Sequence, residues 1–360
     1  MSASAATQGT PTFAYDVTAV DPRANEALFV SLRRASLGDD ATSEAIFRWQ
    51  YLEGPEGPTE ALVLRHLDPV EPVGWTSVQP RRLAIDGHVE LAGLLVNLVV
   101  VPAHRTARPA LLLQRGALAA ARRSYELSYG YPNRAALAGF LRAGYRKLGA
   151  FVRYTCPLRD FDAALARAGV GAGMARFAGG AAGLFGPAAR RALWWRWRHR
   201  YAFAWTDTVD ERLDALWARA SAASQGRVLG ERSAAFLRWR LLAHPDEAHA
   251  LGLLVERRSG ELRGYVAVRR SGERVEVGDF YAEDGSYGPL LDAMLADLSH
   301  DGVEGVDVGY LGRPEVVAAL RARGFRPRED LRTVIVDPGS VPAWLWEPSR
   351  QHLTSADGDL

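Results

Sequence analysis

Segment 97–149 constrains the fold of this chain more than any other stretch of its sequence. An apolar strand over 94–101 leads into a turn with Arg105 and Arg108, and a helix is predicted to open at Pro109. Proline suits the start of a helix because its missing N–H would have no intrahelical partner there. A strand that feeds a helix through a basic turn offers one anion both backbone N–H groups and guanidinium groups. The segment therefore predicts an anion-binding strand–turn–helix unit.

The composition is that of a globular protein. The 360 residues are enough for two domains, and 48% of them are hydrophobic and 24% charged. The 44 basic and 42 acidic residues give a formal net charge of +2. This near balance argues against a dedicated nucleic-acid-binding protein, so no nucleic-acid partner is expected.

Cysteine usage and the apolar runs indicate the compartment. Cys156 is the single cysteine, so no intrachain disulfide can form, as expected in a reducing cytoplasm. Residues 1–12 are small and polar and are predicted to be a disordered tail without a signal peptide. No apolar stretch approaches the roughly 18 residues of a spanning helix, and we expect a cytoplasmic protein.

The predicted elements of the first half recur in the same order in the second half. In the first half we expect strands at 13–20, 61–65, 73–81, 88–101, 128–131 and 151–156, and helices within 23–53 and at 109–127 and 134–142. In the second half we expect strands at 202–207, 250–256, 264–270, 273–281, 305–309 and 332–336, and helices at 212–223, 289–299 and 315–323. This repetition indicates an internal duplication.

The strand–turn–helix unit resembles the acyl-CoA core of the GNAT (GCN5-related) N-acyltransferase superfamily. That family has an Arg-x-x-Gly-x-Gly/Ala turn that cradles the CoA pyrophosphate. Here Arg105 and Ala110 match the turn, and Arg108 stands where the family has glycine. The Pro-Ala ending is similar to GNAT-like proteins of bacterial surface-polysaccharide clusters. The later Gly-x-Pro-Asn at 130–133 and the Gly-Tyr pair at 144–145 resemble the elements that close the family's fold.

The resemblance implies an α/β (α+β) fold with two tandem GNAT-like domains, each a mixed, mostly antiparallel sheet flanked by helices. We expect the two domains at 13–159 and 202–340, an interdomain segment at 160–201, and a C-terminal tail at 341–360.

The resemblance also implies a site for acetyl-CoA or another acyl-CoA, without a metal. The implied cofactor-binding residues lie on the splayed strand, the basic turn and the head of the second helix: Val99, Val100, Val101, Arg105, Arg108, Ala110, Leu111 and Asn133. A solvated basic turn beside an ordinary core strand is the alternative interpretation of the same residues.

The first half offers no evident acid or base. The strand's polar residue is Asn97, which cannot take a proton, and Phe140 stands where the family's general-acid tyrosine is expected. In the second half, Asp279 and Glu283 are candidate catalytic carboxylates, because burial would raise a carboxyl pKa toward neutrality. We expect an acceptor cleft between the two halves, lined by Asp279 and by Glu283. Alternatively, they are edge carboxylates that pair with arginines. The acidic turn 283–288 would repel a pyrophosphate, so a single CoA site is expected.

Residues 190–201 have the most unusual composition of the chain, with arginines and tryptophans interleaved. We expect this segment to pack between the two halves, with peripheral contact to an anionic membrane as the alternative.

These features predict acyl transfer to an amine acceptor. The acceptor would be a small molecule or carrier-linked, such as an amino sugar. The alternatives are a catalytically degenerate GNAT-like scaffold and a peptidoglycan-bridge-type aminoacyl transferase. The oligomeric state stays open.

Overall fold

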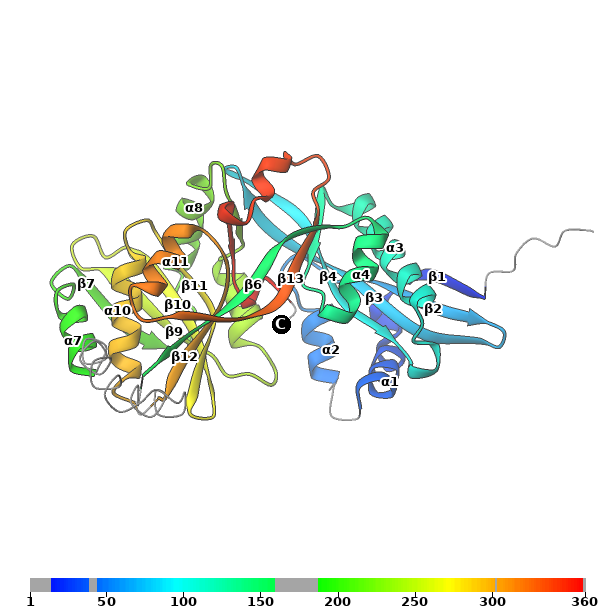
Figure 1. The fold of residues 1–360 in the computed structure, drawn as a ribbon, viewed down its shortest axis with the longest axis horizontal. Helices are drawn as coiled ribbons and strands as arrows, with labels where there is room; N and C mark the ends of the chain where they lie inside the picture. The colour runs from blue at the N-terminus through cyan, green and yellow to red at the C-terminus, as the bar shows by residue number, and fades with distance from the viewer. Residues whose placement is uncertain (1–13, 39–43, 159–186, 302, 359–360) are drawn as a thin grey trace, which may run out of the picture.

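The fold is seen in a computed structural model, which describes residues 14–38, 44–158, 187–301 and 303–358. Two halves lie side by side along the long axis of the molecule (Figure 1). The expected tail at 1–12 and most of the expected interdomain segment fall outside the described residues.

The first half has the element order expected from the sequence. Its strands are β1 (Tyr15–Val20), β2 (Glu60–Leu67), β3 (Val70–Ile85), β4 (His88–Val100), β5 (Leu127–Gly130) and β6 (Arg146–Pro157). Its α-helices are α1 (Glu26–Leu37), α2 (Glu44–Tyr51), α3 (Ala107–Ser124) and α4 (Arg134–Ala143), and its short 3-10 turns are η1 (Pro22–Ala24) and η3 (Pro102–His104).

The second half repeats this order and adds a C-terminal segment. Its strands are β7 (Tyr201–Thr206), β8 (Val228–Gly230), β9 (Ala250–Glu256), β10 (Leu262–Ser271), β11 (Arg274–Ala282), β12 (Gly305–Gly312), β13 (Arg326–Asp337) and β14 (Gln351–Leu353). Its helices are α7 (Pro187–Trp195), α8 (Arg212–Ala222), α9 (Ala234–Leu237), the π-helical η5 (Arg238–Leu242), α10 (Tyr287–Leu298) and α11 (Pro314–Arg321), and its 3-10 turns are η6 (Ala343–Trp346), η7 (Pro348–Arg350) and η8 (Ser355–Asp357).

The two halves share one 14-stranded sheet because they exchange their closing strands. Along the main path of the sheet the order is β1-β2-β3-β4-β5-β13-β6-β12-β11-β10-β9-β7, and β8 and β14 pair off this path. Strand β13 of the second half pairs antiparallel with β5, and β6 of the first half pairs antiparallel with β12. The two exchanged strands also pair with each other, from Arg326↔Thr155 to Val336↔Arg146. Each half therefore lacks a neighbour for its fifth strand unless the other half supplies it.

Alternation along the strands gives the first half two apolar faces. Leu62 and Leu95 pack under α3 and α4, whereas Val63, Trp75 and Val99 face α1 and α2. Strands β2, β3 and β4 are thus covered on both sides at these positions, as Figure 1 shows for the helices around β3 and β4.

Helix α7 does not pack between the halves, contrary to the sequence-based expectation. It packs on α10 at the outer end of the second half (Figure 1). Buried Arg190 donates to the carbonyl oxygens of Pro157 (2.8 Å) and Leu158 (3.3 Å), and this anchors the helix to the end of β6. The expectation that its tryptophans are not all exposed is confirmed, since Trp194 and Trp197 are half-buried.

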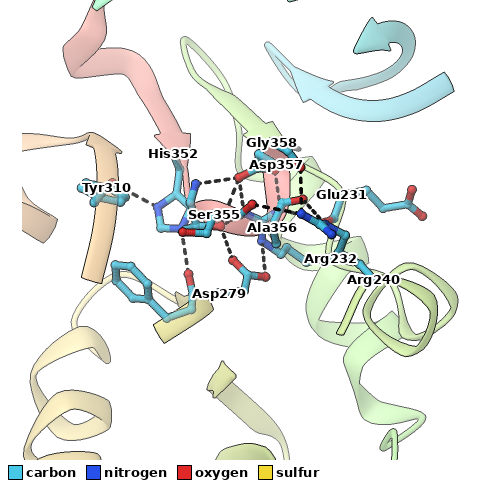
Figure 2. A network of polar contacts seen from close by, with 12 residues as sticks. Glu231, Arg232, Arg240, Asp279, Tyr310, His352, Ser355, Ala356, Asp357 and Gly358 are labelled. Atoms are coloured by element: carbon cyan, nitrogen blue, oxygen red, sulfur yellow. Dashed lines mark hydrogen bonds and ion pairs between the residues drawn. The ribbon is translucent and has the colours of Figure 1, made fainter. Parts of the chain in front are cut away.

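The C-terminal residues 341–358 are a core element rather than a peripheral tail. Strand β14 pairs antiparallel with β12 and parallel with β8, and β8 in turn pairs with β3 of the first half. Beyond β14, the Asp357 carboxylate accepts hydrogen bonds from both terminal nitrogens of Arg232 (2.7 and 2.8 Å). Arg232 also pairs with Asp279 (Nε to Oδ2, 2.9 Å) (Figure 2). The side chains of these three residues are buried, so the segment is fixed by charge as well as by strand pairing.

We predict that His352 makes the stability of the fold depend on pH. Burial lowers the pKa of His352 from 6.5 to about 3, and its Nε2 bonds the carbonyl oxygen of Phe280 (2.9 Å) as a neutral ring. Below about pH 6.5 the unfolded chain takes up a proton that the folded chain refuses. The free energy of unfolding should therefore fall by up to about 2 kcal/mol between pH 6.5 and 5. Urea unfolding at both pH values measures this.

The matched comparison is His352→Gln, which retains a donor and an acceptor, against His300→Gln at an exposed position. The first substitution should reduce the pH dependence and the second should leave it unchanged. An identical slope in all three proteins would contradict the assignment.

Candidate functional site

A bulge at Asn97 separates β4 from β5. Asn97 has a positive φ of 55°, in the left-handed region that asparagine tolerates better than most residues. The register of β4 against β3 shifts at this point, between Trp75 and Ser77. The parallel pairing of β4 with β5 ends at Leu95 and Gly130, so the strands diverge beyond it. This divergence is the splayed strand that the sequence-based interpretation required.

A cavity of about 620 Å³ opens beside the splayed strand, at the N-terminal ends of α3 and α4. Six of the eight predicted cofactor-binding residues line it together: Val100, Arg105, Arg108, Ala110, Leu111 and Asn133. The side chains of Val99 and Val101 do not line the cavity. Alternation along the strand turns Val99 to the opposite face, and both side chains pack against the apolar cluster under α1 and α2. Their predicted contact runs through the backbone and stays a prediction.

The cavity is basic. Arg108 and Arg142 stand at its rim as exposed side chains, and its described lining residues include no carboxylate. Arg105 lines the cavity as expected, and its side chain also makes structural contacts. Its Nε donates to the carbonyl oxygen of Val100 (2.9 Å) and its Nη2 to that of Ser36, so it ties the end of β4 to α1. Arg142 was missed by the sequence analysis because it lies a whole helix away from the basic turn.

Helix α3 begins earlier than predicted, at Ala107, with Thr106 as its N-cap. Pro109 is therefore a first-turn residue rather than the first helical position. The Thr106 side chain makes no capping hydrogen bond, and the N–H groups of a first turn have no intrahelical partner. The helix thus presents donors and its positive dipole end to the cavity.

Gln114 is a second residue that the sequence did not single out. It is 1% exposed, lines the cavity, and its Oε1 has no hydrogen-bond partner among the described residues. Gly139 on α4 allows this close packing, because a Cβ there would collide with Oε1 of Gln114. A buried acceptor left open toward a cavity can receive a ligand N–H or O–H group.

No acid or base was expected in the first half. Asn97 and Phe140, which stand at the positions where one would be sought, make structural contacts. Asn97 donates to Gln50 (2.9 Å) and to the Tyr51 hydroxyl (3.0 Å). Phe140 is buried and packs edge-on against Tyr145. Burial raises the pKa of Tyr145, which keeps its hydroxyl protonated at neutral pH.

Asp279 does not line an open cleft, contrary to the sequence-based expectation. It is 0% exposed, and it accepts hydrogen bonds from Tyr265 and Thr354 beside its ion pair with Arg232. Burial raises the pKa of Asp279, as expected, although the charge of Arg232 acts in the opposite direction. Asp279 is buried, instead of lining a cleft, because the C-terminal segment folds over this end of β11. A catalytic role for Asp279 stays a prediction.

Glu283 pairs with Arg219 (2.5 Å) and Arg263 (2.8 Å), and it lines a cavity of about 230 Å³ instead of a cleft shared with Asp279. The structure therefore does not bring the two predicted carboxylates into one site. The alternative interpretation, that such carboxylates pair with arginines, describes the observed contacts.

In the described part of the second half, the C-terminal segment covers the position equivalent to the cavity at α3. The pairing of β11 with β12 ends at Val277 and Val308, as β4 and β5 diverge in the first half. Beyond that point β14 is bonded to both strands, through Gly312↔His352 and through the His352 bond to the Phe280 carbonyl. The C-terminal segment therefore lies in the gap between the diverging strands of the second half, and the expectation of a single CoA site stays a prediction.

A third cavity, of about 290 Å³, lies where the halves meet. It is lined by the exchanged strands β6 and β13, by β11 and β12, and by η5 and η8. One of its lining residues, Arg332, donates to the carbonyl oxygen of Tyr131 (3.0 Å), which directly follows β5. The side chain of Arg332 therefore links this cavity to the end of the strand from which β4 diverges.

His249 in this third cavity has the properties of a base. Its Nδ1 bonds the carbonyl oxygen of Leu241 (3.1 Å), which fixes a proton on Nδ1 and leaves Nε2 as an acceptor when the ring is neutral. A Cβ on Gly278 would lie 3.1 Å from Nε2, so this glycine keeps the nitrogen open to the cavity. Burial lowers the pKa of His249, which favours the neutral ring.

This architecture is the tandem GNAT fold. A probable N-acyltransferase from Enterococcus faecalis has a similar structure, with a TM-score of 0.63 at 12% identity over 89% of this chain and 72% of that one. A GCN5-related N-acetyltransferase from Kribbella flavida has a TM-score of 0.57 at 16% identity, over 90% and 71%.

A third similar structure is itself duplicated. It is a tandem GNAT protein from the clavulanic acid biosynthesis pathway, with a TM-score of 0.53 at 14% identity over 90% of this chain and 98% of that one. No protein-family profile and no curated protein sequence matches the chain. The similarity therefore establishes the fold and leaves the activity to be argued from the site.

The side-chain clusters and the helices bear on metal binding and on membrane insertion. Within the described part of the chain, no group of three His, Cys, Asp or Glu side chains is arranged to hold a metal ion. No helix in the same part is long and apolar enough to cross a membrane.

The burial of Asp279 generates a prediction that separates a structural role from a catalytic one. Asp279→Asn removes one charge from a buried pair, and this should lower the free energy of unfolding by about 3–5 kcal/mol. A structural carboxylate should leave the turnover of the folded fraction nearly unchanged. Chemical denaturation and activity per folded molecule measure the two effects. A large loss of turnover at unchanged stability would instead support the original catalytic assignment.

Proposed function

We propose that this chain is an acyl-CoA-dependent N-acyltransferase that uses acetyl-CoA or another acyl-CoA. The observation that supports this most directly is the basic cavity beside the splayed end of β4. It combines the open first turn of α3, two rim arginines and a strand that has separated from its parallel neighbour. These are the groups that a long ligand with a diphosphate, amides and a thioester needs.

The residues of the cavity fit such a ligand at two places. Arg108 and the first-turn N–H groups of α3 would hold the diphosphate, with Arg142 across the opening. The free Oε1 of Gln114 would accept a hydrogen bond from the ligand along the cavity wall. The reactive end would then point along β4 toward Asn97 and the end of β5.

The third cavity is the proposed acceptor site, because the Arg332 side chain in its wall contacts the segment after β5. Glu247, Glu276 and Asp307 line it. The first two pair with Arg269 and the third with Arg274, and an acceptor ammonium group would share these carboxylates. Arg153 and Arg269 line it as well, so an acceptor with both cationic and anionic or strongly polar groups fits better than a simple alkylamine. A small amine or the amino sugar of a carrier-linked molecule meets this description.

In the proposed reaction, Nε2 of His249 takes a proton from the acceptor ammonium. The free amine then forms a C–N bond at the thioester carbonyl, and the C–S bond breaks to release a thiolate. The nitrogen loses its second proton to that thiolate or to water. A thiol has an ordinary pKa of about 8.5, so its thiolate can leave without a general acid. This accounts for a site in which Phe140 replaces a tyrosine, and much of the rate enhancement would come from positioning.

A scaffold without activity is the second candidate function. Asn97 and Phe140 favour it, since neither can transfer a proton. The scaffold and the enzyme differ in one measurable property, which is thiol release in the presence of an amine.

We predict that one acetyl-CoA binds per chain and that Arg142→Ala weakens its binding at least about tenfold. Loss of one charge-assisted hydrogen bond to phosphate costs roughly 1.5–3 kcal/mol. Arg123→Ala is the matched control, because Arg123 is exposed near the far end of α3 and pairs with Glu60. Calorimetry measures both affinity and stoichiometry. Failure of wild-type protein to bind, or binding of two molecules, would refute the cofactor assignment.

We also predict that His249→Asn lowers kcat by roughly 10²–10⁴, the usual range for a general base, without changing acetyl-CoA affinity. Asparagine can still donate to the Leu241 carbonyl, so the fold of η5 is retained. Because the pKa of His249 lies below its ordinary value of 6.5, wild-type turnover should fall only in acid solution, and the variant should lose that acid limb. Thiol release with a panel of amines, amino acids and amino sugars gives the readout. An unchanged kcat and pH profile would remove His249 from the mechanism.

A further inference from the structure

Helix α7 and the turn after it form a basic surface at the outer end of the second half. The helical repeat divides the residues into two sets. Arg190, Trp194 and Trp197 face inward, where Arg190 is buried and Trp197 donates to Asp292 (2.9 Å). Arg191 and Trp195 face outward, and Trp195 is 57% exposed.

A broad groove of about 880 Å³ runs between this outward side and the C-terminal end of α10. Arg191, Arg196 and His300 line it with Trp195, and its described lining residues include no carboxylate. Guanidinium and imidazolium groups bind phosphate oxygens through charge-assisted hydrogen bonds. The carboxylates nearest along α10 are occupied. Asp292 is buried against Arg323 (2.8 Å) and also pairs with Arg196 of the groove (3.4 Å), and Asp297 accepts from Trp205 (3.1 Å).

More arginines extend the basic surface beyond the groove. Arg257 donates through Nε to the carbonyl oxygens of Arg198 (2.8 Å) and Tyr201 (3.1 Å), which brings the β9–β10 turn next to the end of α7. Arg198 and Arg258 are exposed there, whereas Arg200 is paired with Glu256 (3.1 Å). Arg196 and Arg200 are therefore paired, and the exposed Arg191, Arg198 and Arg258 keep the surface positive.

We propose that this surface docks the protein on an anionic phospholipid membrane, with lipid phosphates in the groove. A tryptophan at the level of the headgroups and neighbouring arginines are the features of such contacts. Each arginine near an anionic surface contributes about 1 kcal/mol. Nucleic acid is less suited to this surface, because the guanidinium of Arg198 lies 3.1 Å from the centre of the Trp195 ring and covers the face on which a base would stack. The proposal does not depend on the catalytic assignment.

Vesicle flotation tests the proposal with the full chain. Wild-type protein should float with vesicles of equal parts phosphatidylglycerol and phosphatidylcholine, but not with phosphatidylcholine alone. Binding should disappear in 1 M salt, where the Debye length is about 3 Å. Arg191→Glu combined with Arg198→Glu should weaken vesicle binding more than tenfold. Trp195→Ser should also weaken it, and as an exposed position it is not expected to disturb folding.

The matched control is Arg23→Glu combined with Lys147→Glu, which makes the same charge change at exposed sites of the first half. Vesicle binding should survive in this control, and thermal unfolding should show all variants folded. Absence of flotation by wild-type protein, or equal loss in the control, would overturn the proposal. So would a single-stranded oligonucleotide that binds in a Trp195-dependent manner and displaces the vesicles.

Discussion

The antiparallel pairing of β6 with β13 determines the rest of this structure. Each of these strands closes the sheet of the half to which it does not belong in sequence. Neither half can satisfy the backbone of its fifth strand without the other, so the halves form one sheet with a common edge between them. The third cavity lies at this junction, and its walls therefore come from both halves.

The duplication has left two unlike halves. In both, the fourth and fifth strands diverge after a short parallel pairing. In the first half the gap opens into a basic cavity, whereas in the second half the C-terminal segment closes it. Arg232 holds that segment by pairing with Asp279 and Asp357 in a fully buried network (Figure 2). The network buries Asp279, for which a catalytic role was predicted from the sequence, among structural partners.

Two cavities and one groove of the molecule differ in their electrostatic environment. The cavity at α3 is basic, the cavity between the halves is mixed, and the groove at α7 is basic with an exposed tryptophan. A near-neutral chain can hold such different sites because its basic and acidic side chains gather at different places. The net charge of +2 therefore says little about any single site.

The sequence by itself determined the order of the elements and the residues around the cavity at α3. These residues lie within one stretch of about forty positions, where strand, turn and helix signals act locally, so Arg108, Leu111 and Asn133 could be named in advance. Arg142 and Gln114 could not, because their place depends on how α4 packs against α3. The strand exchange, the burial of Asp279 and the position of α7 were decided only by the tertiary structure. Each of these depends on contacts between residues far apart in sequence, and local patterns do not specify which partner a strand or a carboxylate will meet.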